Sequence, residues 1–224
     1  MITELVVFDI AGTTVKDPGK VADSFLAAFL ERGIEVDRES VNHVMGYRKI
    51  EAIQMVLDHK KIGVSEFLVR DIHDIFEEKM LSFYMSSQDL SPLPNTETVF
   101  KWLHSKGIKV ALNTGFTRNI TEGILYRLQW KDSPLVDAVI CSDEVSEGRP
   151  APFMIRELMR RFSIDKPNRV VKVGDTEVDI AEGRNASCGQ VISVTTGAYT
   201  RGELELYKPD AIIDDLSLLP VLIS

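Results

Sequence analysis

The sequence contains little of what marks a secreted, membrane-bound or nucleic-acid-binding protein. Its 224 residues include only two cysteines, Cys141 and Cys188, which are too few for a disulfide framework. No apolar run approaches the roughly 20 residues of a membrane span, and "MITELVVFDI" lacks the charged start and cleavage site of a signal peptide. The formal net charge of -8 argues against nucleic-acid and anionic-membrane partners. We therefore expect a cytoplasmic protein.

What the sequence does contain is an alternation of short apolar runs and amphipathic segments. Runs rich in β-branched residues predict buried strands in "LVVFD", "IKVALNT", "DAVICS", "VVKVGD", "QVISVTTG" and, more weakly, "DAIIDD". Helical patterns such as "TETVFKWLHSKG" and "PFMIRELMRRF" lie between most of them. Strand and helix in turn indicate crossover units. The predicted fold is α/β, with a doubly wound, Rossmann-like parallel sheet.

The segment 16–91 interrupts this alternation, because it shows helical periodicity and no convincing strand. Its first helix is predicted in "DPGKVADSFLAAFLERG", with Asp17 as N-cap, Pro18 at the first helical position and Gly33 just past the end. We interpret residues 16–91 as an all-helical cap domain inserted after the first strand. Residues 1–15 and 92–224 would then form the α/β core.

Polar residues follow four of the predicted strands, at the edge where an open parallel sheet binds its ligands. These residues are Asp9, Thr114, Gly115, Arg149, Asp175 and, one helical turn further on, Asp179. Paired carboxylates with small neighbours suit Mg²⁺, which prefers oxygen ligands. Once Mg²⁺ and Arg149 neutralise a phosphoryl group, an aspartate can attack phosphorus and form an acyl phosphate.

Each of these signals also has a structural explanation when taken alone. Asp9 and the segment "GDTEVD" are typical of helix N-caps or turns. Thr114-Gly115 is typical of a turn, and Arg149 is of a residue type that is common on protein surfaces. Their occurrence in order at four successive strand ends favours a functional site.

Four segments resemble the motifs of the haloacid dehalogenase superfamily: "FDIAGTTV", "NTGFTR", "EGRPAP" and "KVGDTEVDIAEGRNA". Most members carry a second aspartate where this chain has Ala11, and a lysine where it has Arg149. At both positions the chain resembles one branch of the superfamily, the phosphonoacetaldehyde hydrolases (phosphonatases). The resemblance implies Asp9 as nucleophile, Mg²⁺ held by Asp9, the Ala11 carbonyl and Asp175, and Asp179 behind these ligands. It also implies a phosphate site at Thr114, Gly115 and Arg149.

The segment "MGYRKIEAI" resembles the part of the phosphonatase cap that bears a Schiff-base lysine, which maps to Lys49. At about 100° per residue, Lys49 projects close to Ile53 and Val56, on an apolar stripe that a surface lysine would avoid. A partly desolvated amine with a lowered pKa suits imine chemistry, whereas the structural alternative is a lysine that snorkels from a helix interface. Arg48 points about a quarter-turn away, where we expect it to hold an anionic substrate.

Three departures from the phosphonatase pattern leave the substrate open. Ala52 stands where a histidine is expected, Phe116 where a tyrosine is expected, and "KDPGKVADS" holds no cysteine. The leading hypothesis is an Mg²⁺-dependent hydrolase that cleaves the C–P bond of a small carbonyl phosphonate through Asp9 and Lys49. A phosphate-monoester phosphatase, acting for example on phosphoglycolate, is the alternative, although Ala11 cannot protonate an alkoxide. A catalytically silent ligand-binding module is the third. The resemblance also suggests a homodimer through the cap.

Overall fold

A parallel sheet with six strands forms the centre of the protein. The computed structural model describes residues 2–223, and within them the sheet has the order β3-β2-β1-β4-β5-β6. The strands are β1 (Leu5–Phe8), β2 (Lys109–Thr114), β3 (Ala138–Cys141), β4 (Val170–Gly174), β5 (Gln190–Val194) and β6 (Ala211–Ile213). Each pairs with its neighbours in parallel. The predicted α/β class and all six predicted strands are confirmed.

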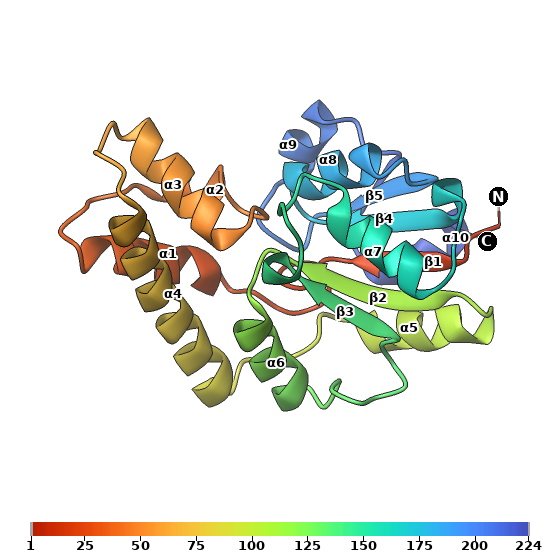
Figure 1. Cartoon of the computed structure of the whole chain (residues 1–224). Helices are drawn as coiled ribbons and strands as arrows, with labels where there is room; N and C mark the ends of the chain where they lie inside the picture. Colours follow the sequence, from red (N-terminus) through yellow and green to blue (C-terminus); the bar gives the residue numbers. More distant parts are fainter. Residues whose placement is uncertain (1, 224) are drawn as a thin grey trace.

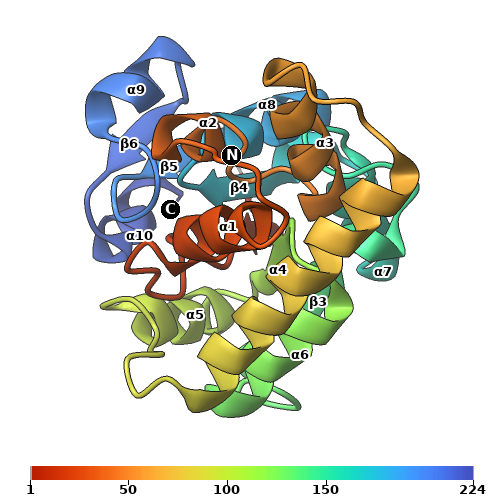
Figure 2. The same ribbon diagram turned by 90° about the vertical axis from the view of Figure 1, so that its left-hand side faces the viewer.

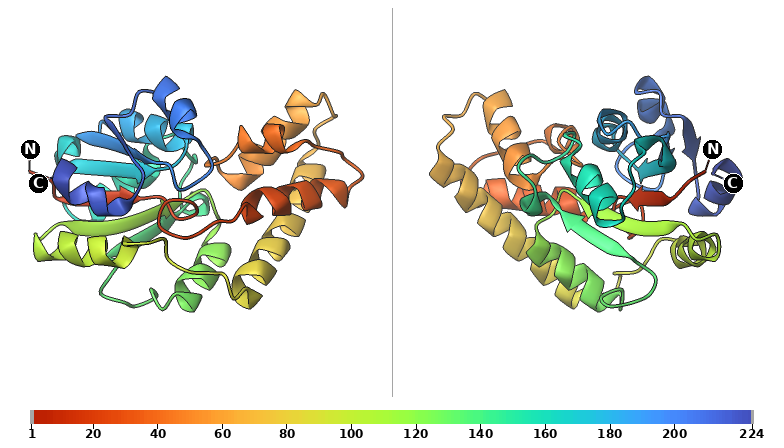
Figure 3. Two further views of the ribbon diagram at one scale, coloured as in Figure 1. Left: turned by 180° about the vertical axis from the view of Figure 1, so that it is seen from behind. Right: turned by 45° about the vertical axis from the view of Figure 1, so that its right-hand side comes forward.

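Helices cover both faces of this sheet (Figure 3). They are α5 (Thr96–Ser105), α6 (Arg118–Arg127), α7 (Phe153–Arg161), α8 (Glu177–Asn185), α9 (Arg201–Leu206) and α10 (Leu219–Leu222), with short 3₁₀ turns at Ser142–Glu144, Pro167–Arg169 and Leu216–Leu218. Because side chains alternate along a strand, Val6 and Phe8 of β1 pack on the α5 face, whereas Leu5 and Val7 pack on the α7 face. Both faces are buried, which explains why β1 reads as an unbroken apolar run.

The segment between β1 and α5, which we call the helical insertion (residues 16–91), contains α1 (Lys20–Leu30), α2 (Arg38–Asn42), α3 (Lys49–His59) and α4 (Glu66–Ser86). These helices lie beyond the carboxyl end of β1, and Figure 2 shows them in front of the sheet, whereas both termini lie at the opposite end of the molecule (Figure 1). The chain leaves and re-enters the core side by side, since Lys16 N donates to the Ser91 carbonyl at 3.0 Å. That the insertion behaves as a separate domain stays a prediction.

The start of α1 differs from the sequence prediction. Gly19, at φ +85°, is the residue before the first helical residue Lys20, so Asp17 is not the N-cap and Pro18 lies outside the helix. Glycine tolerates this left-handed conformation, which turns the chain and delays the helix by two residues. The Asp17 carboxylate nevertheless reaches forward and accepts hydrogen bonds from Lys20 N at 2.7 Å and Val21 N at 3.4 Å.

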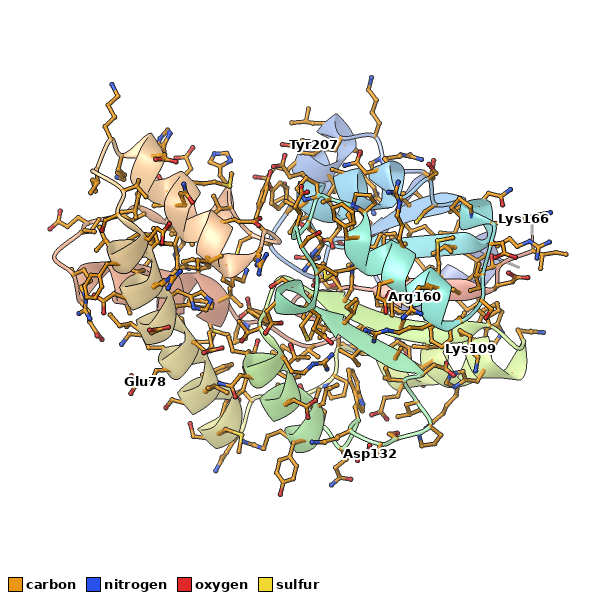
Figure 4. The ribbon with its side chains drawn as sticks, in the orientation of Figure 1. Glu78, Lys109, Asp132, Arg160, Lys166 and Tyr207 are labelled. Carbon is orange, nitrogen blue, oxygen red and sulfur yellow. The ribbon has the colours of Figure 1, made fainter. Side chains whose placement is uncertain are left out.

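Charged side chains cover the outside of both parts of the chain. Glu78 of α4, Arg160 of α7 and Lys166 all point away from the molecule (Figure 4) and are exposed. Among the helices of residues 2–223, none has the length and apolar character needed to cross a bilayer.

Candidate active site

A pocket of about 220 Å³ lies where the helical insertion meets the carboxyl ends of β1, β2 and β4. The core side of the pocket carries the residues predicted from the strand ends, and the insertion contributes ionisable residues of its own. Its principal polar lining residues are Asp9, Asp17, Lys49, Thr114, Arg149, Asp175 and Asp179. The structure therefore brings together all the predicted site residues except Arg48.

Asp9 and Arg149 form an ion pair at the bottom of this pocket. Asp9 directly follows β1, and its backbone N–H donates to the Val173 carbonyl of β4 at 2.9 Å, which holds it at the sheet edge. Its carboxylate Oδ1 lies 2.8 Å from Nη2 of Arg149. Burial raises the pKa of Asp9, while Arg149 opposes this shift. Among the described residues, no group accepts a hydrogen bond from the buried Nε of Arg149, so this N–H is available to a substrate oxygen.

Asp175 has the surroundings expected of a metal ligand. It follows β4, is buried, and accepts hydrogen bonds from the Thr13 hydroxyl at 3.0 Å and from Ala198 N at 2.7 Å. No ion pair within residues 2–223 includes Asp175. Burial raises its pKa well above the usual range, and the nearby Asp9 adds to this shift. Buried charges are normally paired or coordinate a metal. Because Asp175 forms no ion pair among these residues and has Asp9 as a neighbour, the two carboxylates fit a hard divalent ion.

The ligand set implied for Mg²⁺ contains two carboxylates, Asp9 and Asp175, and the Ala11 carbonyl. All three residues line the pocket. No group of three or more His, Cys, Asp or Glu side chains in residues 2–223 forms a metal cluster. A Mg²⁺ site of the implied kind would take its third protein ligand from the backbone and its remaining ligands from water.

Asp179 lies behind this site and anchors Arg149. Its Oδ1 contacts Nη1 of Arg149 and lies 3.0 Å from Nζ of Lys172, while its Oδ2 accepts from the Thr176 hydroxyl at 2.6 Å. Burial alone would raise its pKa, but Lys172 and Arg149 outweigh this effect and lower the pKa of Asp179 to about 2. Asp179 therefore stays ionised and fixes Arg149 from the side opposite Asp9.

Sequence reasoning missed the buried partners of this anchor. Nζ of Lys172 also lies 3.1 Å from Glu182 Oε2 and donates to Asn113 Oδ1 at 2.6 Å. All three side chains are fully buried. Both Lys172 and Asn113 interrupt apolar strands, in "VVKVG" and "VALNT". A polar residue inside a strand that is buried on both faces was the signal that could have found them.

Close contacts between backbones join the helical insertion to the core at this pocket. A Cβ on Gly115 would lie 2.4 Å from the Tyr47 carbonyl oxygen, so a larger residue would force the insertion away. Gly46, at φ +85°, approaches Thr176 in the same way, at 2.6 Å from an added Cβ to the hydroxyl oxygen. Beside Gly115, the Thr114 hydroxyl oxygen accepts from Phe116 N at 3.1 Å, which leaves its proton free for a ligand.

Lys49 is buried in this pocket, with 4% of its surface exposed. It is the first residue of α3, and its Nζ lies 5.2 Å from the ring centre of Phe116 and 5.5 Å from that of Phe25. Burial lowers the pKa of Lys49 to about 8, and the positive charge of Arg149 adds to this shift. The start of a helix, where the dipole is positive, also disfavours a cation.

Arg48 does not line the pocket, and that it holds an anionic substrate stays a prediction. Its side chain instead packs against the core loop that contains Gly148, since a Cβ on Gly148 would lie 2.5 Å from the Cβ of Arg48. Its Nη1 donates to the Ser146 carbonyl at 3.4 Å. The positive charge that lowers the pKa of Lys49 is that of Arg149.

The fold and the site together define a class of proteins with a parallel-sheet core. They carry an aspartate directly after the first strand and an inserted helical segment over it. The family model for haloacid dehalogenase-like hydrolases matches residues 6–193, and the chain belongs to this family. The family assignment that the four motifs suggested is therefore confirmed.

Within the family, the chain resembles phosphonoacetaldehyde hydrolases. It is 31% identical to the enzyme of that name from Bacillus cereus over 92% of this chain and 82% of the relative. It is also 31% identical to the one from Bacteroides fragilis, over 89% and 80%.

Solved structures share the fold at lower identity. A phosphonoacetaldehyde hydrolase-like protein from Oleispira antarctica matches with a TM-score of 0.86 at 21% identity, covering 99% of this chain and 91% of that one. A structure described as a predicted phosphoglycolate phosphatase from Haemophilus somnus matches with a TM-score of 0.81 at 20% identity, covering 99% and 98%.

Proposed function

We propose that this protein cleaves the carbon–phosphorus bond of a small carbonyl phosphonate, with Asp9 as nucleophile and Lys49 as the imine-forming amine. The observation that carries the proposal is the burial of Lys49 in the same pocket as the Asp9–Arg149 pair. The names of the relatives at 31% identity support the same substrate class.

The electrostatics of Lys49 suit an amine that attacks a carbonyl carbon. With a pKa of about 8, about a tenth of the lysine is neutral at pH 7, against roughly one part in 2,500 for an ordinary lysine of pKa about 10.4. The neutral amine adds to the substrate carbonyl, and the resulting carbinolamine takes up a proton and loses water to form an iminium. The positive nitrogen then accepts the electron pair that phosphorus leaves on carbon, so that an enamine forms in place of a bare carbanion.

The core side of the pocket handles the phosphoryl group. Arg149 holds one oxygen of the Asp9 carboxylate, which leaves the other to attack phosphorus and form an aspartyl-phosphate that water later hydrolyses. The Nε of Arg149 and the Thr114 hydroxyl would donate to phosphoryl oxygens. Mg²⁺, held by Asp9, the Ala11 carbonyl and Asp175, would supply the charge that lets one anion approach another.

The second candidate is a phosphate-monoester phosphatase, which the phosphoglycolate phosphatase-like structural neighbour favours. Ester cleavage releases an alkoxide, which needs a proton from a nearby acid. Ala11 occupies the pocket position where most of the family carry that acid, and it has no proton to give. Ester hydrolysis also needs no imine-forming amine, whereas Lys49 is buried in this pocket, so we rank this function second.

Borohydride trapping tests the proposal. Phosphonoacetaldehyde and borohydride are added together, and peptide mapping by mass spectrometry is expected to find the reduced adduct on Lys49. Lys49→Arg keeps the charge but cannot form an imine, so it should abolish both the adduct and phosphate release. Lys101→Arg changes an exposed lysine of α5 and serves as the control. Normal turnover of phosphonoacetaldehyde by Lys49→Arg would refute the imine mechanism.

A further inference from the structure

Asp17 and Lys49 lie on the insertion side of the same pocket. Oδ1 of Asp17 accepts from the two N–H groups at the start of α1, while no hydrogen bond in residues 2–223 involves its Oδ2. Burial raises the pKa of Asp17, and the N–H groups of Lys20 and Val21 and the charge of Lys49 oppose this shift. The carboxyl group is thus fixed in direction, half-buried, and within the electrostatic reach of the Lys49 amine.

Imine formation requires a group that accepts and returns a proton. The carboxylates on the core side of the pocket are not available for this. Asp9 is paired with Arg149 and must stay ionised to attack phosphorus. Asp179 is held by Arg149 and Lys172, and Asp175 faces Thr13 and Ala198 at the proposed metal site.

The insertion offers no other group for these transfers. Among the described residues that line the pocket there is no histidine. The position one turn along α3 is the fully buried Ala52. Tyr84 does not line the pocket, and its pKa is raised well above its usual value, by burial first and then by Asp17, so its hydroxyl stays protonated. By elimination, Asp17 is the pocket residue able to exchange protons with Lys49.

We propose that Asp17 is the proton-transferring residue of imine formation at Lys49, an inference that rests on the proposed carbonyl-phosphonate function. The Asp17 carboxylate takes a proton from the Lys49 ammonium through a bridging water in the pocket that both residues line, and the neutral amine adds to the carbonyl carbon to give a carbinolamine. The resulting carboxylic acid returns the proton to the carbinolamine hydroxyl, which leaves as water as the C=N bond forms. The products are one iminium, one water and a regenerated carboxylate, so charge and atoms balance.

Two substitutions separate this role from the structural role of Asp17 at the start of α1. Asparagine and serine both accept hydrogen bonds from helix N–H groups, so Asp17→Asn and Asp17→Ser keep that contact but cannot carry the proton. Asp37→Asn is the matched control, because Asp37 caps α2 through Ser40 N at 2.7 Å and does not line this pocket. Thermal unfolding verifies that all three variants fold.

The rate of adduct formation at Lys49 is then measured with propanal and cyanoborohydride, a probe that needs no C–P cleavage. Asp17→Asn and Asp17→Ser are expected to slow adduct formation by about 10²-fold or more, the usual range for general acid–base groups, and added imidazole should restore part of the rate in Asp17→Ser. Asp37→Asn should react like the wild type. The affinity for inorganic phosphate should be unchanged in every variant, since phosphate binds on the core side.

Each outcome decides between the two proposals. An unchanged rate in Asp17→Asn, or a slow rate that imidazole does not restore, overturns the role of Asp17 while the imine mechanism stands. If the wild type forms no adduct at Lys49 with either propanal or phosphonoacetaldehyde, both proposals fall together.

Discussion

The guanidinium of Arg149 lies 2.8 Å from the carboxylate of Asp9, and both side chains are almost completely withdrawn from solvent. A buried ion pair offsets the cost of desolvation only where its geometry is good and further hydrogen bonds form. Asp179 contacts Arg149 from the other side. The pair therefore holds one oxygen of Asp9 and orients the other for attack, and it makes Asp9 the first target for mutation.

Asp9→Asn is expected to abolish phosphate release, because an amide oxygen is a poor nucleophile and cannot form the aspartyl-phosphate. The fold should survive, since Arg149 remains paired with Asp179. A malachite-green phosphate assay measures turnover, and circular dichroism verifies the fold. Turnover close to that of the wild type would exclude covalent catalysis by Asp9.

Ala11→Asp distinguishes the two candidate reactions. In an ester phosphatase that lacks its acid, the new carboxyl group should raise ester hydrolysis, since general acid catalysis typically contributes about 10²–10⁴-fold. In a C–P hydrolase the same group crowds the pocket and should lower the rate. Initial rates on phosphonoacetaldehyde and phosphoglycolate are compared, with Ala11→Ser as a control that adds bulk without an acid. A gain on the ester with no loss on the phosphonate would favour the phosphatase.

Asp175→Asn tests the metal site independently of activity. The wild type should show a higher melting temperature with added Mg²⁺, because the ion neutralises two buried carboxylates. In Asp175→Asn this Mg²⁺-dependent shift should shrink, because an amide oxygen replaces a charged oxygen ligand of the ion. Chelation by EDTA should stop turnover of the wild type. Equal Mg²⁺ shifts in the two proteins would place the ion elsewhere.

The pKa of about 8 for Lys49 predicts how imine formation depends on pH. In Asp17→Asn, which has no internal proton acceptor, only the amine that is already neutral reacts, so its rate should rise about tenfold per pH unit below pH 8 and level off above it. A surface lysine would still be gaining reactivity near pH 10. Adduct formation with propanal and cyanoborohydride is followed from pH 6 to 9.5, below the range where alkali affects the fold. A rate that keeps rising up to pH 9.5 would show that the pKa of Lys49 is not lowered.

Most of the fold could be predicted from the sequence, because strand and helix periodicities are local signals. The six strands and the helical insertion appear where the apolar runs and amphipathic patterns lie. The prediction at the start of α1 was wrong by two residues, since the positive φ of Gly19 overrode the capping signal of Asp17. The packing of Arg48 against Gly148 could not be read from the sequence, because it joins segments far apart in the chain.

By itself, the sequence determined the class of fold, the family and the identity of the strand-end residues, since these depend on which residue follows which strand. Only the tertiary structure decided how the charges pair. Arg149 lies between Asp9 and Asp179, Asp175 forms no ion pair within residues 2–223, and Asp17 lines the same pocket as Lys49. These relationships join segments far apart in the chain. They depend on how the insertion packs over the sheet, and burial there sets the pKa of each group more strongly than any neighbour in sequence.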